Sequence, residues 1–480
     1  MTAGPSTVVE GDSPSARGGM PVPAGPAVHA DRHRSAVAWV TVSVLGGLIL
    51  VEGARQGGFW RPDALVVAVT AFLALMAQVF LSPPGRTSRW VTCGLMALAA
   101  AWLVRAFSAG TPASFLPFGA SVIAFAAAFV AVRALTGRQQ AVAASFVAVV
   151  GILGALIGWA GVIWRWYPMA IPTQRLWRLS STLTYSDAAG MVLAVCLLVA
   201  LAGGPRPWVS RLAVFLCAGG AIGAQSRGAL VALACALLII PGRQFVTFLV
   251  PLVAGVGLGM VAVATSSSTT PVPWLAVVVV AGALGSLLWT PHLTISWQRE
   301  TRSRVRYLLV MAFAVVLVAL AGIGLHHEIA LRISSPSDQD RAVEWSAALH
   351  QFVGAPLYGV GPDRLLQFKA ADGTYAHFAH NEYLQIAADV GLVGLALLAA
   401  IGASLARIIR RVDVLTSCAT AALVCWAVAG AFDFDWHLTF VGLLGGWVAG
   451  LAAGPVLAGE TSVGIVGDPC ESSRVERSQS

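Results

Sequence analysis

The sequence predicts an all-α, polytopic integral membrane protein with about 12–14 transmembrane helices and one long extracytoplasmic loop. Of its 480 residues, 57% are hydrophobic and only 11% are charged, whereas about a quarter of an ordinary soluble domain is charged. The charged residues gather in short islands, and the apolar runs between them approach the length of about 20 residues that crosses a bilayer. These observations exclude a water-soluble globule.

Apolar runs of membrane length recur along the chain, about fourteen in all. They lie near 36–52, 64–82, 90–107, 114–135, 141–164, 186–203, 208–224, 228–242, 244–264, 274–290, 305–325, 383–403, 414–432 and 438–458. The two runs after Ser210 are short for a full crossing, so broken or tilted helices are an alternative there. The first run follows basic residues as a signal peptide would, but no small-residue cleavage site follows before Glu52, so we expect a retained span.

These runs divide the chain into two tails, two groups of spans and one loop. We predict a disordered cytoplasmic tail at 1–35, an N-terminal transmembrane helix bundle at 36–325, an extracytoplasmic loop at 326–380, C-terminal transmembrane helices at 381–459 and a disordered cytoplasmic tail at 460–480. The first tail is rich in Pro, Gly, Ser and Ala and lacks apolar periodicity, and the last stretch has the same character.

Arginine islands predict the orientation of the spans, because short cytoplasmic loops are rich in Lys and Arg. The islands recur in alternate loops, at Arg86 and Arg89, Arg133 and Arg138, Arg206 and Arg211, Arg243, Arg299–Arg306, and Arg407–Arg411. We therefore expect a plasma (inner) membrane protein with both termini cytoplasmic and its active site extracytoplasmic. The net charge of +8 reflects this topology, and we expect no nucleic-acid partner.

Arginines on the opposite face break this charge bias and indicate an anionic ligand. Arg165, Arg175 and Arg178 lie in one predicted loop, and Arg227 lies in the tight turn Gln-Ser-Arg-Gly between two apolar runs. A planar guanidinium beside a serine and a glycine suits contact with a phosphate. The alternatives are contact with lipid headgroups for the loop arginines and a snorkelling surface arginine at Arg227.

The long polar segment predicts a lid over the membrane surface. Arg341, Glu344, Trp345 and Leu349 have helical spacing, which is typical of a short amphipathic helix that rests on the bilayer. The chain returns to the membrane at His380, close to the carboxylate of Glu382. A histidine with a pKa near neutrality, oriented by a carboxylate, suits a general base; a capping or interfacial histidine is the alternative.

The run H-N-E-Y-L-Q-I-A-A-D-V-G-L-V-G from His380 to Gly394 resembles the signature of the O-antigen ligase and polymerase family, a His-Asn pair, a nine-residue spacer and G-x-x-G. Further elements are similar and occur in family order: the segment R-L-S-S-T-L-T-Y-S-D-A-A-G from Arg178, the S-R-G at Arg227, the P-L-Y-G-V-G-P at 356–362 and the D-F-D-W-H at Asp433. Asp187 departs from the pattern, because Asn is common there, and Leu395 is a second departure.

The resemblance implies a GT-C-like membrane glycosyltransferase. Such proteins transfer a glycan from an undecaprenyl-diphosphate carrier to a lipid, glycan or protein acceptor, in contact with membrane lipids and without a nucleotide sugar, and the resemblance implies no metal and no cofactor. Position by position, it implies that Arg178 and Arg227 bind the diphosphate and that His380 activates the acceptor hydroxyl. We expect further substrate-binding residues at Arg175, Arg341, Asn381, Glu382, Asp433, Asp435 and His437.

Several alternatives stay open on the sequence. Asp433 and Asp435 form a D-x-D, which binds a divalent metal in other glycosyltransferases, but the turn is very short and no third acidic ligand lies nearby, so orientation of His380 or an arginine is favoured. A solute transporter is disfavoured because the polar residues gather on one face and inverted halves are not evident. A scaffold without catalysis is the remaining alternative. Ligases, polymerases and protein-glycosylating enzymes share these motifs, so the acceptor stays open.

Overall fold

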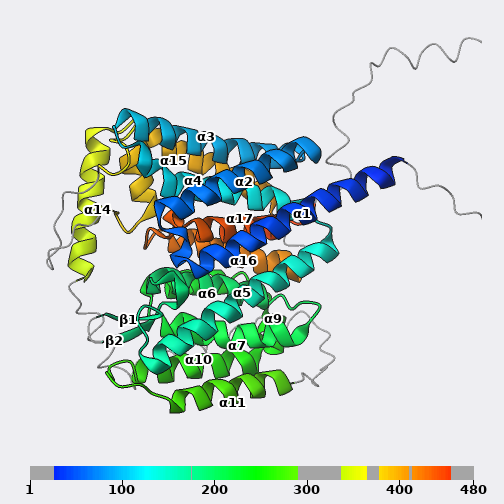
Figure 1. Cartoon of the computed structure of the whole chain (residues 1–480), viewed down its shortest axis with the longest axis vertical. Coiled ribbons are helices and arrows are strands. Elements are labelled where there is room, and N and C mark those ends of the chain that lie inside the picture. Colours follow the sequence, from blue (N-terminus) through cyan, green and yellow to red (C-terminus); the bar gives the residue numbers. More distant parts are fainter. Residues whose placement is uncertain (1–25, 174–175, 290–336, 365–377, 410–412, 456–480) are drawn as a thin grey trace, which may run out of the picture.

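The computed structural model describes residues 26–173, 176–289, 337–364, 378–409 and 413–455. Most of its helices run alongside one another in a bundle (Figure 1). Within these ranges, six helical segments are long and apolar enough to cross a bilayer. They correspond to α1 (Pro26–Ala54), α2 (Arg61–Leu81), α3 (Arg86–Ser108), η2 (Pro112–Ser114) with α4 (Phe115–Arg133), α5 (Gly137–Trp164) and α15 (Glu382–Ile408). The chain is therefore an all-α polytopic membrane protein, as the sequence predicts.

Shorter apolar helices complete the bundle. They are α6 (Ser186–Ala200), α7 (Pro207–Gly223), α8 (Arg227–Leu237), α10 (Leu249–Ala264), α11 (Trp274–Leu288), α16 (Val414–Ala429) and α17 (Thr439–Ala453), with the six-residue α9 (Gly242–Thr247) between α8 and α10. The 11 residues of α8 span only about 16 Å, about half the hydrocarbon thickness. The broken helix that the sequence left open after Ser210 is thus found at α8. The predicted run at 305–325, the predicted tail at 460–480 and residues 1–25 of the predicted tail at 1–35 lie outside the described residues. The rest of that first tail, from Pro26, is not disordered but forms the start of α1.

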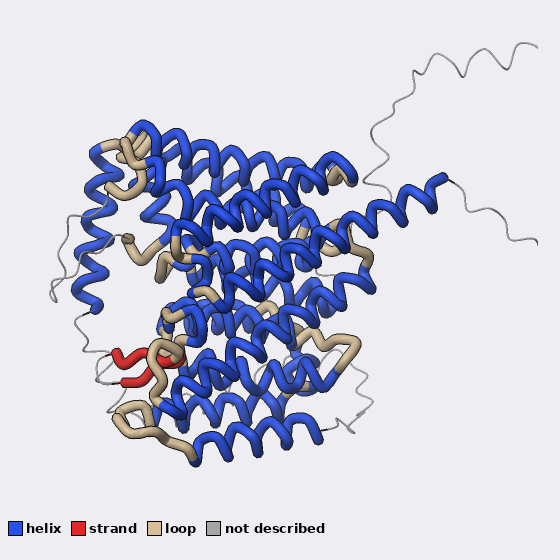
Figure 2. Tube along the Cα trace, in the orientation of Figure 1, coloured by secondary structure: helices blue, strands red, loops and turns tan. Residues whose placement is uncertain are grey.

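One end of the bundle carries most of the irregular structure, and we call it the site end. There β1 (Ala170–Thr173) pairs antiparallel with β2 (Leu176–Leu179), and α14 (Ser337–Gly354) crosses the ends of the other helices (Figures 1 and 2). Short 3-10 turns lie at η1 (Gln56–Gly58), η3 (Ser181–Leu183) and η4 (Asp435–His437). The sequence predicted only a loop around β1 and β2, because strands of four residues are too short to show a periodic pattern.

The centre of the bundle is held by small residues that let helices approach closely. Gly442, Gly446 and Gly450 lie four residues apart on α17 and face α4. A Cβ at Gly446 would lie 2.1 Å from the carbonyl oxygen of Phe125, so only glycine allows this packing. Glycine stripes of this kind bring membrane helices together where the hydrophobic effect gives no help.

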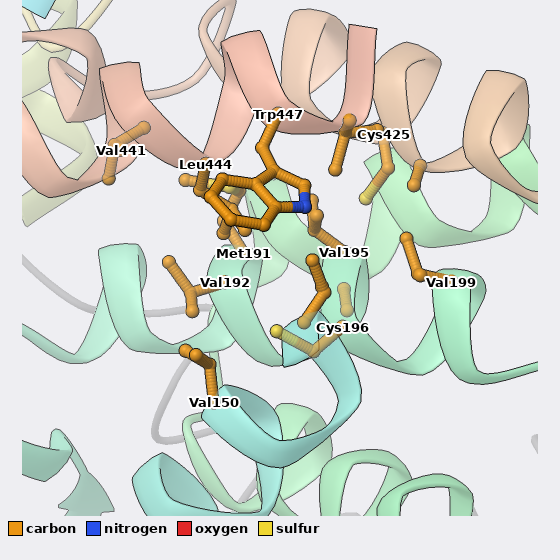
Figure 3. Packing of buried hydrophobic residues seen from close by; sticks show 14 of the residues in the cluster. Val150, Met191, Val192, Val195, Cys196, Val199, Cys425, Val441, Leu444 and Trp447 are labelled. Carbon is orange, nitrogen blue, oxygen red and sulfur yellow. The ribbon is translucent and has the colours of Figure 1, made fainter. Parts of the chain in front are cut away.

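A large aromatic side chain fills the space on the other side of α17. Trp447 is 1% exposed and packs toward Met191 and Val195 of α6 and Cys425 of α16 (Figure 3). Its indole N–H donates to the carbonyl of Ala143 at 3.2 Å, which satisfies the one polar group that it buries. The core therefore fixes α5, α6, α16 and α17 relative to one another, and the site end inherits that rigidity.

Candidate active site

Arg178 joins strand β2 to the ends of α6 and α7. Its Nη2 forms an ion pair with Asp187 at 2.7 Å, and its Nε donates to the carbonyl of Ala224 at 3.0 Å. Nη2 also lies 3.4 Å from the carbonyl of Gln225. The residue is 4% exposed. Arg178 therefore carries a buried positive charge and fixes the turn that leads into α8.

Arg227 is the first residue of α8 and lies at the site end. Ser226 caps this helix by accepting a hydrogen bond from the backbone N–H of Ala229 at 3.3 Å. A Cβ on Gly228 would lie 2.5 Å from Phe432, so α8 begins in close contact with the end of α16. The half-buried guanidinium of Arg227 thus stands at a helix N-terminus, where the backbone also favours an anion.

Arg341 connects α14 to two carboxylates of the bundle. Its Nη2 lies 3.4 Å from Asp433 and 3.7 Å from Asp187, and 27% of its side chain is exposed. Burial opposes the charge of Arg341, but the surrounding carboxylates outweigh it and raise the pKa of the guanidinium. Asp433 in turn accepts hydrogen bonds from the hydroxyl of Tyr185 at 2.7 and 2.6 Å. Burial raises the pKa of Asp433, which therefore carries less negative charge than an exposed aspartate.

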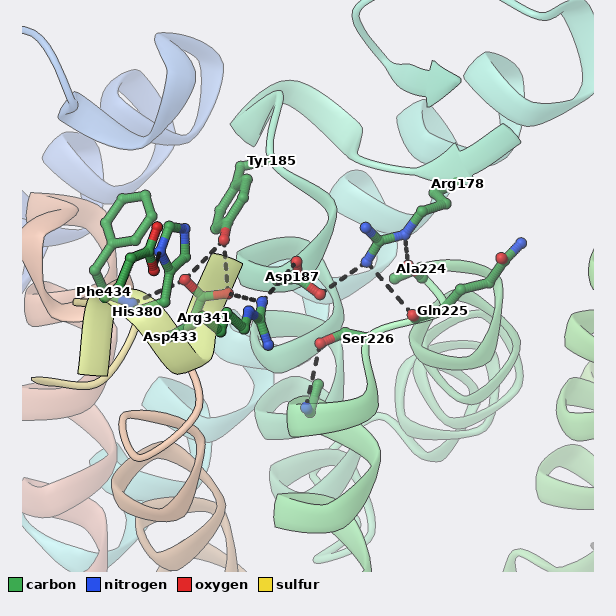
Figure 4. A network of polar contacts seen from close by, with 12 residues as sticks. Arg178, Tyr185, Asp187, Ala224, Gln225, Ser226, Arg341, His380, Asp433 and Phe434 are labelled. Carbon is green, nitrogen blue, oxygen red and sulfur yellow. Dashed lines mark hydrogen bonds and ion pairs between the residues drawn. The ribbon is translucent and has the colours of Figure 1, made fainter. Parts of the chain in front are cut away.

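His380 lies at the other end of this network from Arg178 (Figure 4). Its Nδ1 is 2.7 Å from Glu344 of α14, and the ring of Phe434 meets it edge-on at 5.0 Å. Burial lowers the pKa of His380, but the hydrogen bond to Glu344 and the charges of Asp433 and Glu344 raise it above its ordinary value. The sequence placed Glu382 beside His380; the structure supplies Glu344 instead.

Asn381 and Glu382 tie the start of α15 to the turn between α16 and α17. The Asn381 side chain accepts a hydrogen bond from the first turn of α15 at 3.0 Å and donates to the carbonyl of Ala431 at 2.9 Å. Glu382 is fully buried, accepts from the backbone N–H of Trp436 at 2.6 Å and lies 3.2 Å from Nδ1 of His437. The contacts of these predicted substrate-binding residues hold the loops on either side of His380 in place.

The two aspartates of the D-x-D differ in their surroundings. Asp433 contacts Tyr185 and Arg341, whereas one carboxylate oxygen of Asp435 has no hydrogen-bond partner among the described residues. Burial, with the nearby carboxylates of Asp433, Asp187 and Glu382, raises the pKa of Asp435 well above its ordinary value. Asp435 therefore favours its protonated form more than an exposed aspartate does.

The loop after α14 interlocks with a kink in α15. Gly391 interrupts the helix with φ 69° and ψ −155°, and this frees the carbonyls of Ala388 and Asp389. The backbone N–H groups of Val360 and Gly361 donate to those two carbonyls at 2.8 and 3.0 Å. The P-L-Y-G-V-G-P segment and the G-x-x-G of the sequence are thus two halves of one joint, and this joint positions α14 over the bundle.

A small cleft lies at the centre of the charged network. It is lined by Asp187, Ser226, Arg341, Asp433 and Asp435, together with residues of α8 and α16. Its volume of about 10 Å³ holds about one water molecule. The ion pairs of Arg341 therefore close the site, and a ligand of phosphate size needs α14 to move.

The remaining arginines of the predicted loop have other positions. Arg165 ends α5, donates to the carbonyl of Val162 at 2.8 Å and to that of Thr265, and lies 5.8 Å from the centre of the Trp177 ring. These contacts join α5 to the end of α10. Arg175 lies outside the described residues.

Comparison with known protein families finds a match for the part of the chain that includes His380. Residues 253–399 match the family model described as O-antigen ligase. This part of the chain is therefore similar to O-antigen ligases. The match supports assignment to the O-antigen ligase and polymerase family, whose members process glycans in membranes. A comparison with curated proteins finds no match.

The charged network extends beyond the matched residues. The match includes Arg341, Glu344 and His380. Arg178 and Asp433 lie outside it, and the structure links both to Arg341 through the carboxylate pairs described above. Tyr185, Asp187 and Glu344 belong to the charged network, although the sequence did not select them as site residues. Their signals were the family-like segment that follows Arg178, which contains Tyr185 and Asp187, and the helical spacing of Glu344 with Arg341.

Proposed function

We propose that the protein transfers a glycan from an undecaprenyl-diphosphate carrier to an acceptor hydroxyl at the extracytoplasmic face of the plasma membrane. The observation that carries this proposal is the polar network that runs from a carboxylate-paired histidine through Arg341 to the buried Arg178 (Figure 4). Transfer with a diphosphate leaving group requires a base for the acceptor hydroxyl and a positively charged site for the diphosphate. The network provides one at each end. The O-antigen ligase match supports the same reaction class.

His380 acts as the general base. Its free ring nitrogen accepts the proton of the acceptor hydroxyl while Glu344 holds the other nitrogen and stabilises the imidazolium that forms. The acceptor oxygen forms a bond to the anomeric carbon, and the bond from that carbon to the diphosphate oxygen breaks. The electron pair leaves with the undecaprenyl diphosphate, and direct displacement inverts the anomeric centre.

The arginines stabilise the negative charge that the leaving diphosphate gains. Arg178 is buried in a short ion pair, so it contributes fixed charge and holds the turn before Arg227. Arg341 is more exposed, and its ion pairs are longer, so it can exchange a carboxylate partner for a phosphate oxygen. The raised pKa of Asp435 reduces the negative charge of this carboxyl group and so limits the repulsion that the diphosphate meets.

The orientation follows from the arginine islands. Arg86, Arg138 and Arg206 lie at the bundle end opposite the site end, and the positive-inside rule places that end in the cytoplasm. This orientation brings the site to the face where a carrier-linked glycan awaits transfer. It places both termini in the cytoplasm.

The test is transfer from a purified undecaprenyl-diphosphate-linked glycan in proteoliposomes, with a membrane extract as acceptor. We expect His380→Ala to abolish transfer and Arg227→Ala to slow it by about 100- to 1,000-fold, the usual cost of one charge-stabilising group. His350→Ala is the matched control, because this exposed histidine of α14 lies away from the network. A parallel sample with EDTA tests the D-x-D metal alternative, and we expect no loss.

Wild-type rates in both His380→Ala and Arg227→Ala would contradict the proposal. Product analysis then identifies the reaction within the class. A finished glycan on a new lipid or protein indicates a ligase, whereas a lengthened carrier-linked chain indicates a polymerase. Solute uptake that depends on Arg227, without any glycan product, would favour the transporter alternative.

A further inference from the structure

Two buried polar side chains of α15, Gln385 and Asp389, take no part in the chemistry proposed above. They are 2% and 0% exposed, and they lie four residues apart, so they share one face of the helix. Burial of a polar group costs free energy unless the group is hydrogen-bonded. The hydrogen-bond partners of these two side chains therefore indicate what they hold in place.

Gln385 bridges Asp389 and the backbone next to His380. Its Nε2 donates to Oδ2 of Asp389 at 2.7 Å, and its Oε1 accepts from the backbone N–H of Ala379 at 2.8 Å. The two bonds fix the amide in one orientation, because its nitrogen must face the carboxyl group and its oxygen must face the N–H group. Asp389 thus acts through Gln385 on the residue directly before His380.

The backbone at His380 depends on such support. His380 has φ 46°, in the left-handed region, which a non-glycine residue adopts only where the surrounding structure holds it there. Ala379 is fully buried, so without Gln385 its N–H group would lose its partner where water does not replace it. The bond from Gln385 therefore helps to fix the direction in which the imidazole leaves the backbone.

The backbone of Asp389 holds the other member of the pair. Its carbonyl accepts a hydrogen bond from the N–H of Gly361 at 3.0 Å, in the loop after α14. In turn, α14 supplies Glu344, whose carboxylate lies 2.7 Å from Nδ1 of His380. Asp389 therefore reaches His380 through Gln385 and reaches the helix of Glu344 through its own backbone.

A small apolar cluster packs α14 against the same two places. Ala348 lies one turn after Glu344 on the same face of α14 and forms a buried cluster with Ala379 and Ala388. These two alanines directly precede the histidine and the aspartate in the chain. A displacement of Ala379 therefore disturbs α14 and the histidine together.

We propose that Gln385 and Asp389 are positioning residues that hold His380 and Glu344 in the geometry in which His380 takes the proton of the acceptor. The inference rests on the proposed function, because it takes His380 as the base. It also gives a physical role to the spacer between the His-Asn pair and Gly391. One helical turn after Asn381 brings Gln385 within reach of Ala379, and the next turn brings Asp389 to the kink.

The first test breaks the bridge and then restores it. Gln385→Glu places a second carboxyl group against that of Asp389, so the bond between them is lost, and Gln385→Ala removes the bridge without adding a charge. Adding Asp389→Asn to Gln385→Glu restores the bond with donor and acceptor exchanged, because the new amide donates to the new carboxylate. Gln140→Glu is the matched control: Gln140 is 1% exposed and donates to the carbonyl of Val132 at 3.1 Å, at the opposite end of the bundle.

In the transfer assay, both single Gln385 variants should lower kcat per folded protein by about tenfold or more, because a small misplacement of a catalytic group is enough for such a loss. The donor KM should stay within about threefold, since the arginines keep their places. The double variant should regain most of the lost kcat. Gln140→Glu should lower the melting temperature and leave kcat unchanged. A double variant as slow as Gln385→Glu, or an equal loss of kcat in Gln140→Glu, would overturn the proposal.

The second test does not depend on transfer. Diethylpyrocarbonate modifies neutral imidazole, and the rate at His380, whose side chain is 24% exposed, is read from the mass of its peptide. Both single Gln385 variants should raise this rate by about threefold or more, because a ring that loses Glu344 is more often neutral and has both nitrogens free. Glu344→Gln provides the reference for complete loss of the pair.

The double variant should return to the wild-type modification rate. An unchanged rate in both single Gln385 variants would overturn the proposal. If the modification rates respond as expected but the wild type transfers no glycan, the positioning of His380 by Gln385 and Asp389 stands and the proposed function fails.

Discussion

The basicity of His380 depends on Glu344, which lies 36 residues earlier in the chain. The hydrogen bond between them holds one tautomer of the imidazole and stabilises its protonated form, so the pKa of His380 is raised. Because only the neutral imidazole accepts a proton, the transfer rate should rise with pH through this raised pKa. The pH profile therefore reports on the pair.

Glu344→Gln should shift that rising limb to lower pH, since loss of the carboxylate lowers the pKa of His380. The maximal rate should fall by about tenfold or more, because a weaker base remains and its imidazolium loses a partner. The measurement is transfer rate against pH from about 5 to 9 around the ordinary pKa of histidine. Glu344→Asp should recover part of the rate. An unshifted limb in Glu344→Gln would show that the pair does not set the basicity.

The two aspartates of the D-x-D should respond differently to the same change. Asp433→Asn places an amide where Arg341 and Tyr185 now donate, so it should lower transfer by about tenfold or more, as expected for a broken charged hydrogen bond. Asp435→Asn replaces a carboxyl group of raised pKa with a neutral amide of the same shape and should leave the rate within about threefold. Equal losses in both variants would instead favour the metal alternative, and added Mg²⁺ or Mn²⁺ would then change the rate.

At the scale of elements, the kink in α15 determines where α14 lies. The Gly391 break exposes carbonyls that the loop after α14 uses, and Gly359 fits against the backbone of Asp389. Both glycines have positive φ, 69° and 65°, and a Cβ on either would lie within 2.6 Å of backbone atoms. The joint therefore accepts only glycine at both positions.

Gly391→Ala should loosen this joint, because φ 69° with ψ −155° is a conformation that non-glycine residues adopt at a cost of about 1–3 kcal/mol. We expect a lower melting temperature in detergent and a lower transfer rate, since both Arg341 and Glu344 reach the site through α14. Gly257→Ala in α10 is the control, because a Cβ there meets nothing within 4 Å. A Gly391→Ala protein with wild-type melting and transfer would show that the joint is dispensable.

At the scale of the whole molecule, the bundle places every proposed catalytic contact at one end. Thr269, between α10 and α11, lies at that site end, and Arg138, at the start of α5, lies at the opposite end. From the positive-inside rule, we expect the site end on the extracytoplasmic side. Orientation is thus a testable property of the molecule as a whole.

In a cysteine-free background, Thr269→Cys should react with a membrane-impermeant maleimide added to intact cells. Arg138→Cys should react only after the membrane is permeabilised. Both positions are exposed, so access depends on the side of the membrane and not on burial. The opposite labelling pattern would invert the topology and remove the carrier-linked donor from the site.

The sequence predicted the apolar helices of the described ranges because a membrane span needs only length and apolarity, which are local properties. It also selected His380, Arg178, Arg227 and Arg341 as candidate site residues. Ionisable residues are rare in such a chain and costly to place near the membrane, so each is a candidate for a functional role. It did not find the β1–β2 hairpin or the kink at Gly391, because neither changes the apolar pattern.

The sequence by itself determined the fold class and, through motif order, the family that the O-antigen ligase match supports. Only the tertiary structure decided which groups touch: Glu344 pairs with His380 in place of Glu382, and Arg341 links Asp187 to Asp433. The reason is physical: hydropathy depends on each residue alone, whereas a pKa, an ion pair or a groove depends on residues that the fold brings together from distant parts of the chain.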